Sequence, residues 1–168
     1  VLQHVQMADR AQLRKMKQLY VLANFFSNHI FYFGDKHAAL TIGPERARQM
    51  DPCRSARDIG VHFAIHSDAP VTPMGPLFTA WCAVNRLTES GKVLGEYERI
   101  TVSDALYAIT LGAAYTLQMD DEVGSIEAGK RADFAVLEED PESVDPSLLK
   151  DIEIWGTVLD GLKHPVPQ

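Results

Sequence analysis

The sequence predicts an α/β fold in which a parallel sheet precedes a small β-rich unit. Residues 1–26 form a β-prone run, an amphipathic helical segment and a second β-prone run, joined by short links. This succession is typical of a parallel sheet, because parallel strands need a helical crossover between them. A third β-prone run follows at 61–66, and after residue 121 the pattern indicates strands without helices between them.

Local patterns predict the first three elements in order. The run "VLQHVQ" (1–6) is apolar and β-prone, which indicates a short buried strand. Asp9 is expected to cap a helix over 10–19, whose apolar residues recur at helical spacing: Leu13, Met16 and Leu19. The run "YVLANFF" (20–26) is then the second strand.

The next segment is the least regular part of the chain. Residues 27–44 contain two glycines and several aromatic residues but no clear period, so we expect a long loop. Loops of this length in compact domains are usually functional or disordered, and the aromatic content argues against disorder. Pro44 is well placed to open a helix over 44–50, and a further helix is expected over 51–60, ending at Gly60.

The strand at 61–66 ends on the polar group His66-Ser67-Asp68. Strand alternation directs one set of residues towards covering helices (Val61, Phe63 and Ile65) and the other set towards the interior (His62, His66 and Asp68). Asp68 then stands at the carboxyl end of a parallel strand, where α/β folds place their active sites. Two alternatives remain open: Asp68 caps the following turn, and the two histidines are hydrogen-bonded interior residues.

The second half of the chain is expected to carry helices and then a β tail. A loop rich in proline and glycine at 69–76 precedes a helix over 77–89, and 90–99 is a polar connector. Thr101 and Asp104 match a capping box, which opens a helix running to about Met119. The tail has a strand at 132–138 and two more short strands around a turn at Gly156.

Composition limits the function classes. The chain has 168 residues, 46% of them hydrophobic, and a net charge of −7, without a basic run of the kind that binds nucleic acid or anionic membranes. It has no apolar stretch of about 20 residues and no signal peptide, so we expect a cytoplasmic protein. Cys53 and Cys82 fit no CxxC pattern and are expected to be free thiols. Because Val1 lies in a strand already under way, we expect the chain to be part of a longer protein.

Three residues whose side chains commonly bind metals lie at or near predicted strand ends in the parallel part: His4, His29 and Asp68. One sheet edge could bring them together, and imidazole with carboxylate is a common ligand set for Zn²⁺. A bound metal lowers the pKa of its water towards about 7, and a nearby carboxylate can accept the proton. The alternative is that each histidine is structural.

Two stretches carry a resemblance to a known family. "HSDAPV" (66–71) and "LGAAYTLQMDDEVGSIEAGKRADFAVLEEDP" (111–141) resemble motifs of the amidohydrolase superfamily, in particular amidohydrolase family 3, the N-substituted formamide deformylase-like group. The resemblance covers nearly the whole chain. It implies that residues 1–120 are the carboxyl-terminal half of a (β/α)8 TIM-type barrel, with parallel strands five to eight, and that 121–168 are the carboxyl-terminal part of a β-sandwich domain.

The resemblance also implies roles for single residues. His4 matches a metal ligand on strand five, and His29 a metal ligand on strand six. Asp68 matches the strand-eight aspartate, which binds metal and serves as general base and acid. His37 falls on a loop that approaches the substrate. The family has glycine where His66 stands, and we expect His66 to position Asp68 by a hydrogen bond, to add a ligand or to fill space.

The implied activity is hydrolysis of a C–N bond in an amide or cyclic amide, with one or two divalent metal ions, expected to be zinc. The family's H-x-H and metal-bridging residues are absent from this chain, so we expect the segment to be inactive alone. Half a barrel leaves sheet edges open, which favours self-association or pairing with a missing amino-terminal half. The alternatives are a non-catalytic interaction or regulatory domain that keeps the fold, and deamination or lactone hydrolysis by the same fold.

Overall fold

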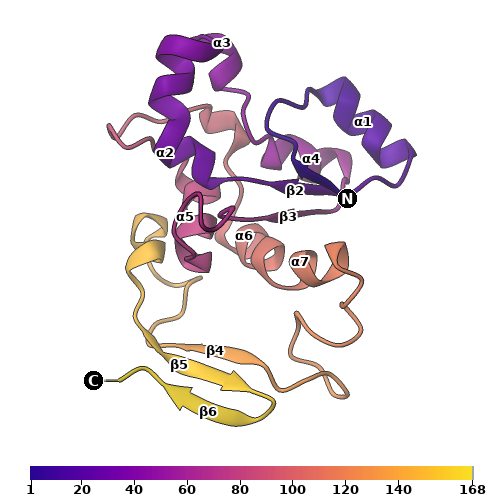
Figure 1. The fold of residues 1–168 in the computed structure, drawn as a ribbon, viewed down its shortest axis with the longest axis vertical. Helices are drawn as coiled ribbons and strands as arrows, with labels where there is room; N and C mark the ends of the chain where they lie inside the picture. The colour runs from indigo at the N-terminus through magenta and orange to yellow at the C-terminus, as the bar shows by residue number, and fades with distance from the viewer. Residues whose placement is uncertain (168) are drawn as a thin grey trace.

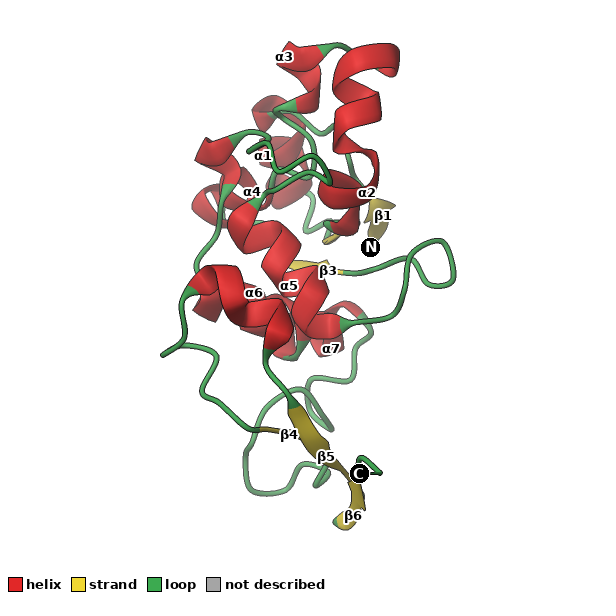
Figure 2. Cartoon of the chain, turned by 90° about the vertical axis from the view of Figure 1, so that its left-hand side faces the viewer, coloured by secondary structure: helices red, strands yellow, loops and turns green. Residues whose placement is uncertain are grey.

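A computed structural model describes residues 1–167, which form two separate three-stranded sheets joined by helices (Figure 1). The parallel sheet consists of β1 (Leu2–His4), β2 (Ala23–Phe25) and β3 (Phe63–Ile65). The antiparallel sheet consists of β4 (Phe134–Leu137), β5 (Ile154–Leu159) and β6 (Leu162–Pro165). Helices α6 (Val102–Ile109) and α7 (Leu111–Thr116) lie between the two sheets in both views (Figures 1 and 2). The expected succession of a parallel α/β part and a β tail is confirmed.

The strands of the parallel sheet pair in chain order, β1 to β2 to β3. The expectation of four strands, five to eight, is wrong for residues 1–167, because the segment between β2 and β3 forms helices instead of a strand. These are α2 (Asn28–Lys36), α3 (Pro44–Ala47) and α4 (Cys53–Ile59). If Asp68 follows strand eight, as the resemblance implies, direct pairing makes β2 strand seven and β1 strand six. On this numbering His4 still falls on a strand that the resemblance gives a metal ligand, strand six. His29 follows strand seven, so its proposed role as a ligand rests on its position near His4.

Helix α1 (Arg10–Gln18) confirms the expected cap. The Asp9 side chain accepts a hydrogen bond from the Gln12 N–H at 2.8 Å, and the Gln12 side-chain oxygen accepts one from the Asp9 N–H. Leu13 and Met16 are buried in the hydrophobic core, together with residues of the parallel sheet. Helix α5 (Pro76–Asn85) follows the third strand; it begins one residue before and ends four residues before the helix expected over 77–89.

The loop expected over 27–44 is wrong, because α2 and a π-helix over His37–Thr41 occupy most of it. Gly34 contributed to the misreading, since a mid-segment glycine usually weakens a helix. Here it is required by packing: a Cβ at Gly34 would lie 2.9 Å from the Thr88 side chain and 3.0 Å from Leu94. That contact comes from residues far along the chain, so local pattern could not show it.

Two boundaries in the second half also differ from expectation. Gly156 lies inside β5, where the backbone of β6 approaches so closely that a Cβ would lie 2.5 Å from the His164 carbonyl oxygen. The turn is at Asp160 and Gly161, both with positive φ. The Thr101–Asp104 capping box is confirmed, but the helix it opens ends at Ile109, and α7 begins two residues later after the irregular Thr110.

The main hydrophobic core joins the parallel sheet to α1, α4, α5 and α6, and it includes Leu149 and Ile152 from the tail. These two residues belong to, or directly follow, a 3-10 helix over Pro146–Asp151. The Trp81 indole of α5 donates a hydrogen bond to the Ser147 carbonyl oxygen at 2.8 Å. Part of the tail therefore packs with the first half of the chain, while the division expected at residue 120 stays a prediction.

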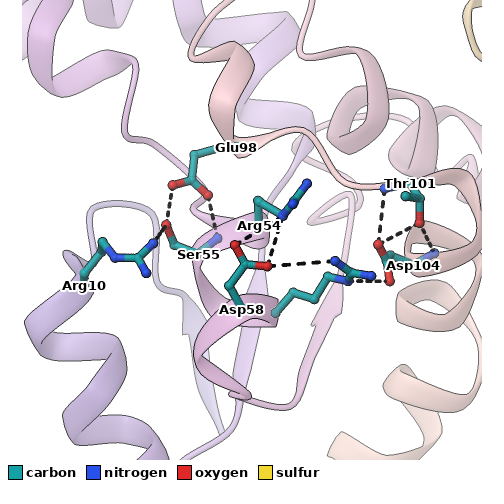
Figure 3. Close-up of polar contacts among 8 residues, drawn as sticks. Arg10, Arg54, Ser55, Asp58, Glu98, Thr101 and Asp104 are labelled. Atoms are coloured by element: carbon teal, nitrogen blue, oxygen red, sulfur yellow. Dashed lines mark hydrogen bonds and ion pairs between the residues drawn. The ribbon is translucent and has the colours of Figure 1, made fainter.

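Polar contacts fix α4 against the segment that leads into α6 (Figure 3). The Ser55 N–H and hydroxyl donate hydrogen bonds to the two carboxylate oxygens of Glu98, at 2.8 and 2.5 Å. The Arg57 guanidinium donates to Asp104 at 2.8 Å, so the capping residue of α6 also binds α4. These contacts hold α4 against Glu98 and against Asp104 in the first turn of α6.

Among the helices of residues 1–167, none combines the length and the apolar character that crossing a bilayer requires.

Candidate metal centre

The carboxyl ends of the parallel strands bring three metal-binding side chains together. His4 ends β1, while His66 and Asp68 follow β3. One ligand-type atom from each of these residues lies within 4.8 Å of the others. The parallel register explains this convergence, since His4 pairs with Phe25 and Phe25 pairs with Ile65, directly before His66.

The ring distances around His4 place two further imidazoles near it. The His4 and His66 ring centres are 5.1 Å apart, and the His4 and His29 ring centres are 6.1 Å apart. Two imidazoles that share one tetrahedral zinc ion have ring centres about 5 Å apart. His29 therefore lies within a small ring movement of the cluster, although it does not belong to the 4.8 Å group.

The backbone at the cluster is unusual. His4, Val5 and Asp68 have φ values of 66°, 47° and 52°, in the left-handed region that non-glycine residues rarely adopt. Val5 is the most strained of the three, because its branched Cβ crowds the backbone there. Residues held in such conformations cluster at functional sites, where the surrounding structure fixes them. The strain accords with a site whose geometry is held in place.

The side chains present fit a divalent metal. Three buried ring nitrogens have no hydrogen-bond partner within residues 1–167: His4 Nδ1, His29 Nδ1 and His66 Nε2. Buried polar atoms are nearly always hydrogen-bonded, so these atoms call for an explanation. The imidazoles that carry these atoms, with the Asp68 carboxylate, are nitrogen and oxygen groups suited to Zn²⁺, and either nitrogen of a neutral ring can be the ligand atom.

His66 is the exception within this set. The Asp68 N–H donates a hydrogen bond to His66 Nδ1 at 3.1 Å, so this nitrogen is an acceptor. A neutral imidazole carries its single proton on the other nitrogen in that case. Nε2 of His66 is then an N–H donor without a lone pair for a metal. The expected hydrogen bond to Asp68 exists, and it joins His66 to the Asp68 main chain.

The predicted residues line one open pocket of about 430 Å³. His4, His29, His37 and Asp68 all face it, whereas His66 is absent from its lining. The remaining lining residues are Gln6, Phe26, Phe33 and Val71. Sequence reasoning missed the two phenylalanines as site residues, and its only signal for them was the aromatic content noted near 27–44. They give the pocket an apolar wall beside its imidazoles.

Burial keeps the imidazoles neutral. It lowers the pKa of His29 to about 4, with His37, His4 and His66 acting in the same direction and Asp68 opposing. Burial also lowers the pKa of His37 and of His66. Neutral imidazole is the form that binds a metal ion, so these shifts favour metal binding at neutral pH.

His37 stands at the start of the π-helix and at the rim of the site. Its Nδ1 lies 2.8 Å from the Thr41 hydroxyl, and its ring centre is 6.1 Å from that of His29. π-helical turns occur frequently at functional sites. The position accords with the expected role of His37 near the substrate, which stays a prediction.

Comparisons with known proteins identify what the chain is similar to. A family model described as "Amidohydrolase family" matches residues 1–162. The N-substituted formamide deformylase of Arthrobacter pascens is 37% identical over 111 residues, which cover 66% of this chain and 20% of that protein. The chain spans between 20% and 24% of the length of three curated relatives.

Solved structures agree with the family match. An uncharacterized metal-dependent hydrolase from Pyrococcus horikoshii superposes with a TM-score of 0.73 at 26% identity, over 86% of this chain and 29% of that one. An adenosine deaminase from Xanthomonas campestris with bound zinc has a TM-score of 0.68 at 20% identity, over 98% of this chain and 36% of that one. The second likeness shows the fold alone.

Proposed function

This chain belongs to the amidohydrolase family, and on that premise we propose that the whole protein is a metal-dependent hydrolase of amide or cyclic amide C–N bonds. The observation that carries the proposal is the convergence of His4 and Asp68 from two strands, with ligand atoms within 4.8 Å. The similarity to an N-substituted formamide deformylase supports an amide as the substrate class.

The proposed metal ligands are His4, His29 and Asp68. His66 is the competing third ligand by distance, but its Nδ1 accepts the Asp68 N–H, which leaves a proton on Nε2. Zinc is the ion to test first, because the ligand set suits it and one structural neighbour holds it. When bound, the metal would polarise the substrate carbonyl and lower the pKa of the attacking water.

Asp68 would move the proton. In amide hydrolysis the water oxygen bonds to the carbonyl carbon, and a base must accept a proton from that water. The Asp68 carboxylate faces the pocket and is the carboxylate among its lining residues. It would then donate the same proton to the leaving nitrogen as the C–N bond breaks, which yields a carboxylic acid and an amine.

The other pocket residues would bind the substrate. His37 offers a hydrogen bond at the rim, and Phe26 and Phe33 offer an apolar wall. This combination suits an amide with a bulky or aromatic substituent, since aromatic side chains bury much apolar area.

We further propose that the parallel sheet is part of a (β/α)8 barrel and that it pairs with further chain. In residues 1–167, β1 and β3 each pair with β2 alone, so both edges of this sheet are open. Open edges invite pairing with another strand. Light scattering of the purified chain tests self-association, and co-expression with the remaining portion of the parent protein tests complementation.

The metal proposal is tested by zinc titration of the chain, followed calorimetrically, with the bound metal counted after dialysis. We expect binding that is lost in His4→Ala and in Asp68→Asn. His62→Ala is the matched control, because His62 lies on the same stretch as β3 but is exposed and packs near Tyr115. If the wild-type chain binds no zinc, manganese or cobalt, the non-catalytic interaction domain becomes the better reading.

A further inference from the structure

Asp51 is a buried acidic residue with no role so far in the fold or in the proposed reaction. It lies between α3 and α4, is fully buried, and has a left-handed φ of 47°. Its N–H donates to the Gln6 carbonyl oxygen at 2.8 Å, and its own carbonyl oxygen accepts from Cys53 and Arg86. Its main chain is therefore fixed on both sides.

The carboxylate of Asp51 faces a ring nitrogen of the pocket. Neither of its oxygens has a hydrogen-bond partner in the part of the chain that the structure describes. Oδ2 lies 3.9 Å from His29 Nδ1, which is itself buried and unpartnered among those residues. Two buried polar atoms of complementary type thus face one another about 1 Å beyond hydrogen-bond distance.

We propose that Asp51 is the positioning residue of His29: its Oδ2 accepts a hydrogen bond from His29 Nδ1–H, which directs His29 Nε2 into the pocket. The proposal rests on the proposed metal site and adds the residue that orients one of its ligands. Histidines that bind metals commonly donate their other ring N–H to a carboxylate, which fixes the ring and its tautomer.

Burial raises the pKa of the Asp51 carboxyl well above its usual range, and the fully buried Arg86 guanidinium opposes this by stabilising the negative charge. Cys53, Glu98 and Tyr97 are the other titratable groups whose charge acts on Arg86. A donor from His29 would offset part of the desolvation of the carboxylate.

His29 and His66 then differ in the group that their Nδ1 atom faces. Nδ1 of His66 faces a donor, the Asp68 N–H, so the ring proton lies on Nε2. Nδ1 of His29 faces an acceptor, the Asp51 carboxylate, which attracts the ring proton to Nδ1 and leaves Nε2 with a free lone pair. The two neighbouring histidines therefore have opposite tautomers and opposite roles.

The test is ¹⁵N–¹H NMR of the histidine rings in the metal-free chain. We expect the His29 proton on Nδ1 in the wild type and in Asp51→Asn, whose side-chain oxygen still accepts. We expect loss of that preference in Asp51→Leu. Glu98→Gln is the control, because it also removes a buried negative charge beside Arg86 but does not face His29. A wild-type His29 with its proton on Nε2 overturns the proposal, even if Asp51→Leu does not fold.

Zinc affinity gives a second measurement. Loss of a carboxylate that orients a metal-binding histidine weakens metal binding by about 10–100-fold. We expect a change of this size in Asp51→Leu, a smaller change in Asp51→Asn and little change in Glu98→Gln. Unchanged affinity in a folded Asp51→Leu would contradict the proposal. If the wild type binds no zinc, the proposed function fails while the NMR result still decides the role of Asp51.

Discussion

The Asp68 N–H donates a hydrogen bond to Nδ1 of His66, two residues earlier, at 3.1 Å. The bond ties the His66 side chain to the main chain of the proposed base. Asp68 also has a left-handed φ of 52°, which an L residue adopts only when the surrounding structure holds it there. His66 is one of the groups that hold it.

Replacing His66 tests this relationship. His66→Asn keeps an acceptor at the right place, since an asparagine oxygen accepts from the N–H two residues on in an Asx-turn. His66→Gly leaves the half-buried N–H unpaired, and we expect it to lower the free energy of unfolding by about 1–3 kcal/mol. Urea unfolding of both variants measures the difference. Equal stability of His66→Gly and wild type would show that the hydrogen bond contributes nothing.

The strand-end pattern singled out residues that the structure brings to one pocket, and their roles as ligands and base stay predictions. His4, His29, His37 and Asp68 were all placed at strand ends or the nearby loop, and the parallel register brings them to one pocket. Strand ends are a local pattern, which is why they could be read. Asp51 could not be found in this way, because its significance lies in facing His29, 22 residues earlier in the sequence.

The errors in the fold have a common physical cause. Gly34 and Gly156 were read as loop and turn signals, yet each lies where another segment packs too closely for a Cβ. Such packing is set by tertiary contacts, which override local propensity. The cap at Asp9 and the capping box at Thr101 were predicted correctly because the groups involved lie within one turn of helix.

The pH dependence of stability follows from the same hydrogen bond. Burial, with His4 in the same direction, lowers the pKa of His66 below its usual 6.5, while Asp68 and the Asn24 carbonyl oppose this. The unfolded chain therefore takes up this proton at a higher pH than the folded chain. Stability from His66 is complete above pH 6.5 and is lost as the pH falls through the lower folded pKa.

We accordingly expect the metal-free wild type to lose stability relative to His66→Asn as the pH falls below 6.5. Protonation of Nδ1 also removes the acceptor for the Asp68 N–H, which acts in the same direction. Urea titrations at several pH values, with a chelator present, give the two profiles. Parallel profiles would show that His66 does not titrate differently in the folded and unfolded chains.

The two cysteines are expected to be inert in the folded protein. Cys53 and Cys82 are free and fully buried, and burial raises the pKa of both thiols. Only the thiolate reacts rapidly with disulfide reagents. We expect no reaction with such a reagent in buffer and reaction of both thiols in urea, followed by absorbance. Rapid modification of either cysteine in buffer would mean that the core around it opens readily.

Arg86 links the stability of the fold to the geometry of the site. Its guanidinium is fully buried and donates hydrogen bonds to the carbonyl oxygens of Leu94 and Met50, both at 2.7 Å, and of Asp51 at 3.1 Å. The planar fork of an arginine serves several acceptors at once, which a lysine ammonium on its flexible stem cannot reproduce. The Arg86 side chain is therefore one of the groups that hold the segment carrying Asp51 in place.

We expect Arg86→Lys to lower the free energy of unfolding by roughly 3 kcal/mol, because buried acceptors lose their partners and the charge remains. Arg99→Lys is the control, since Arg99 is partly exposed and donates to the Asn85 carbonyl oxygen from the surface. Under conditions where the Arg86→Lys variant is folded, we expect it to bind zinc more weakly than the wild type, because Asp51 would no longer face His29. A destabilised variant with unchanged zinc affinity would mean that Arg86 supports the fold without positioning the site.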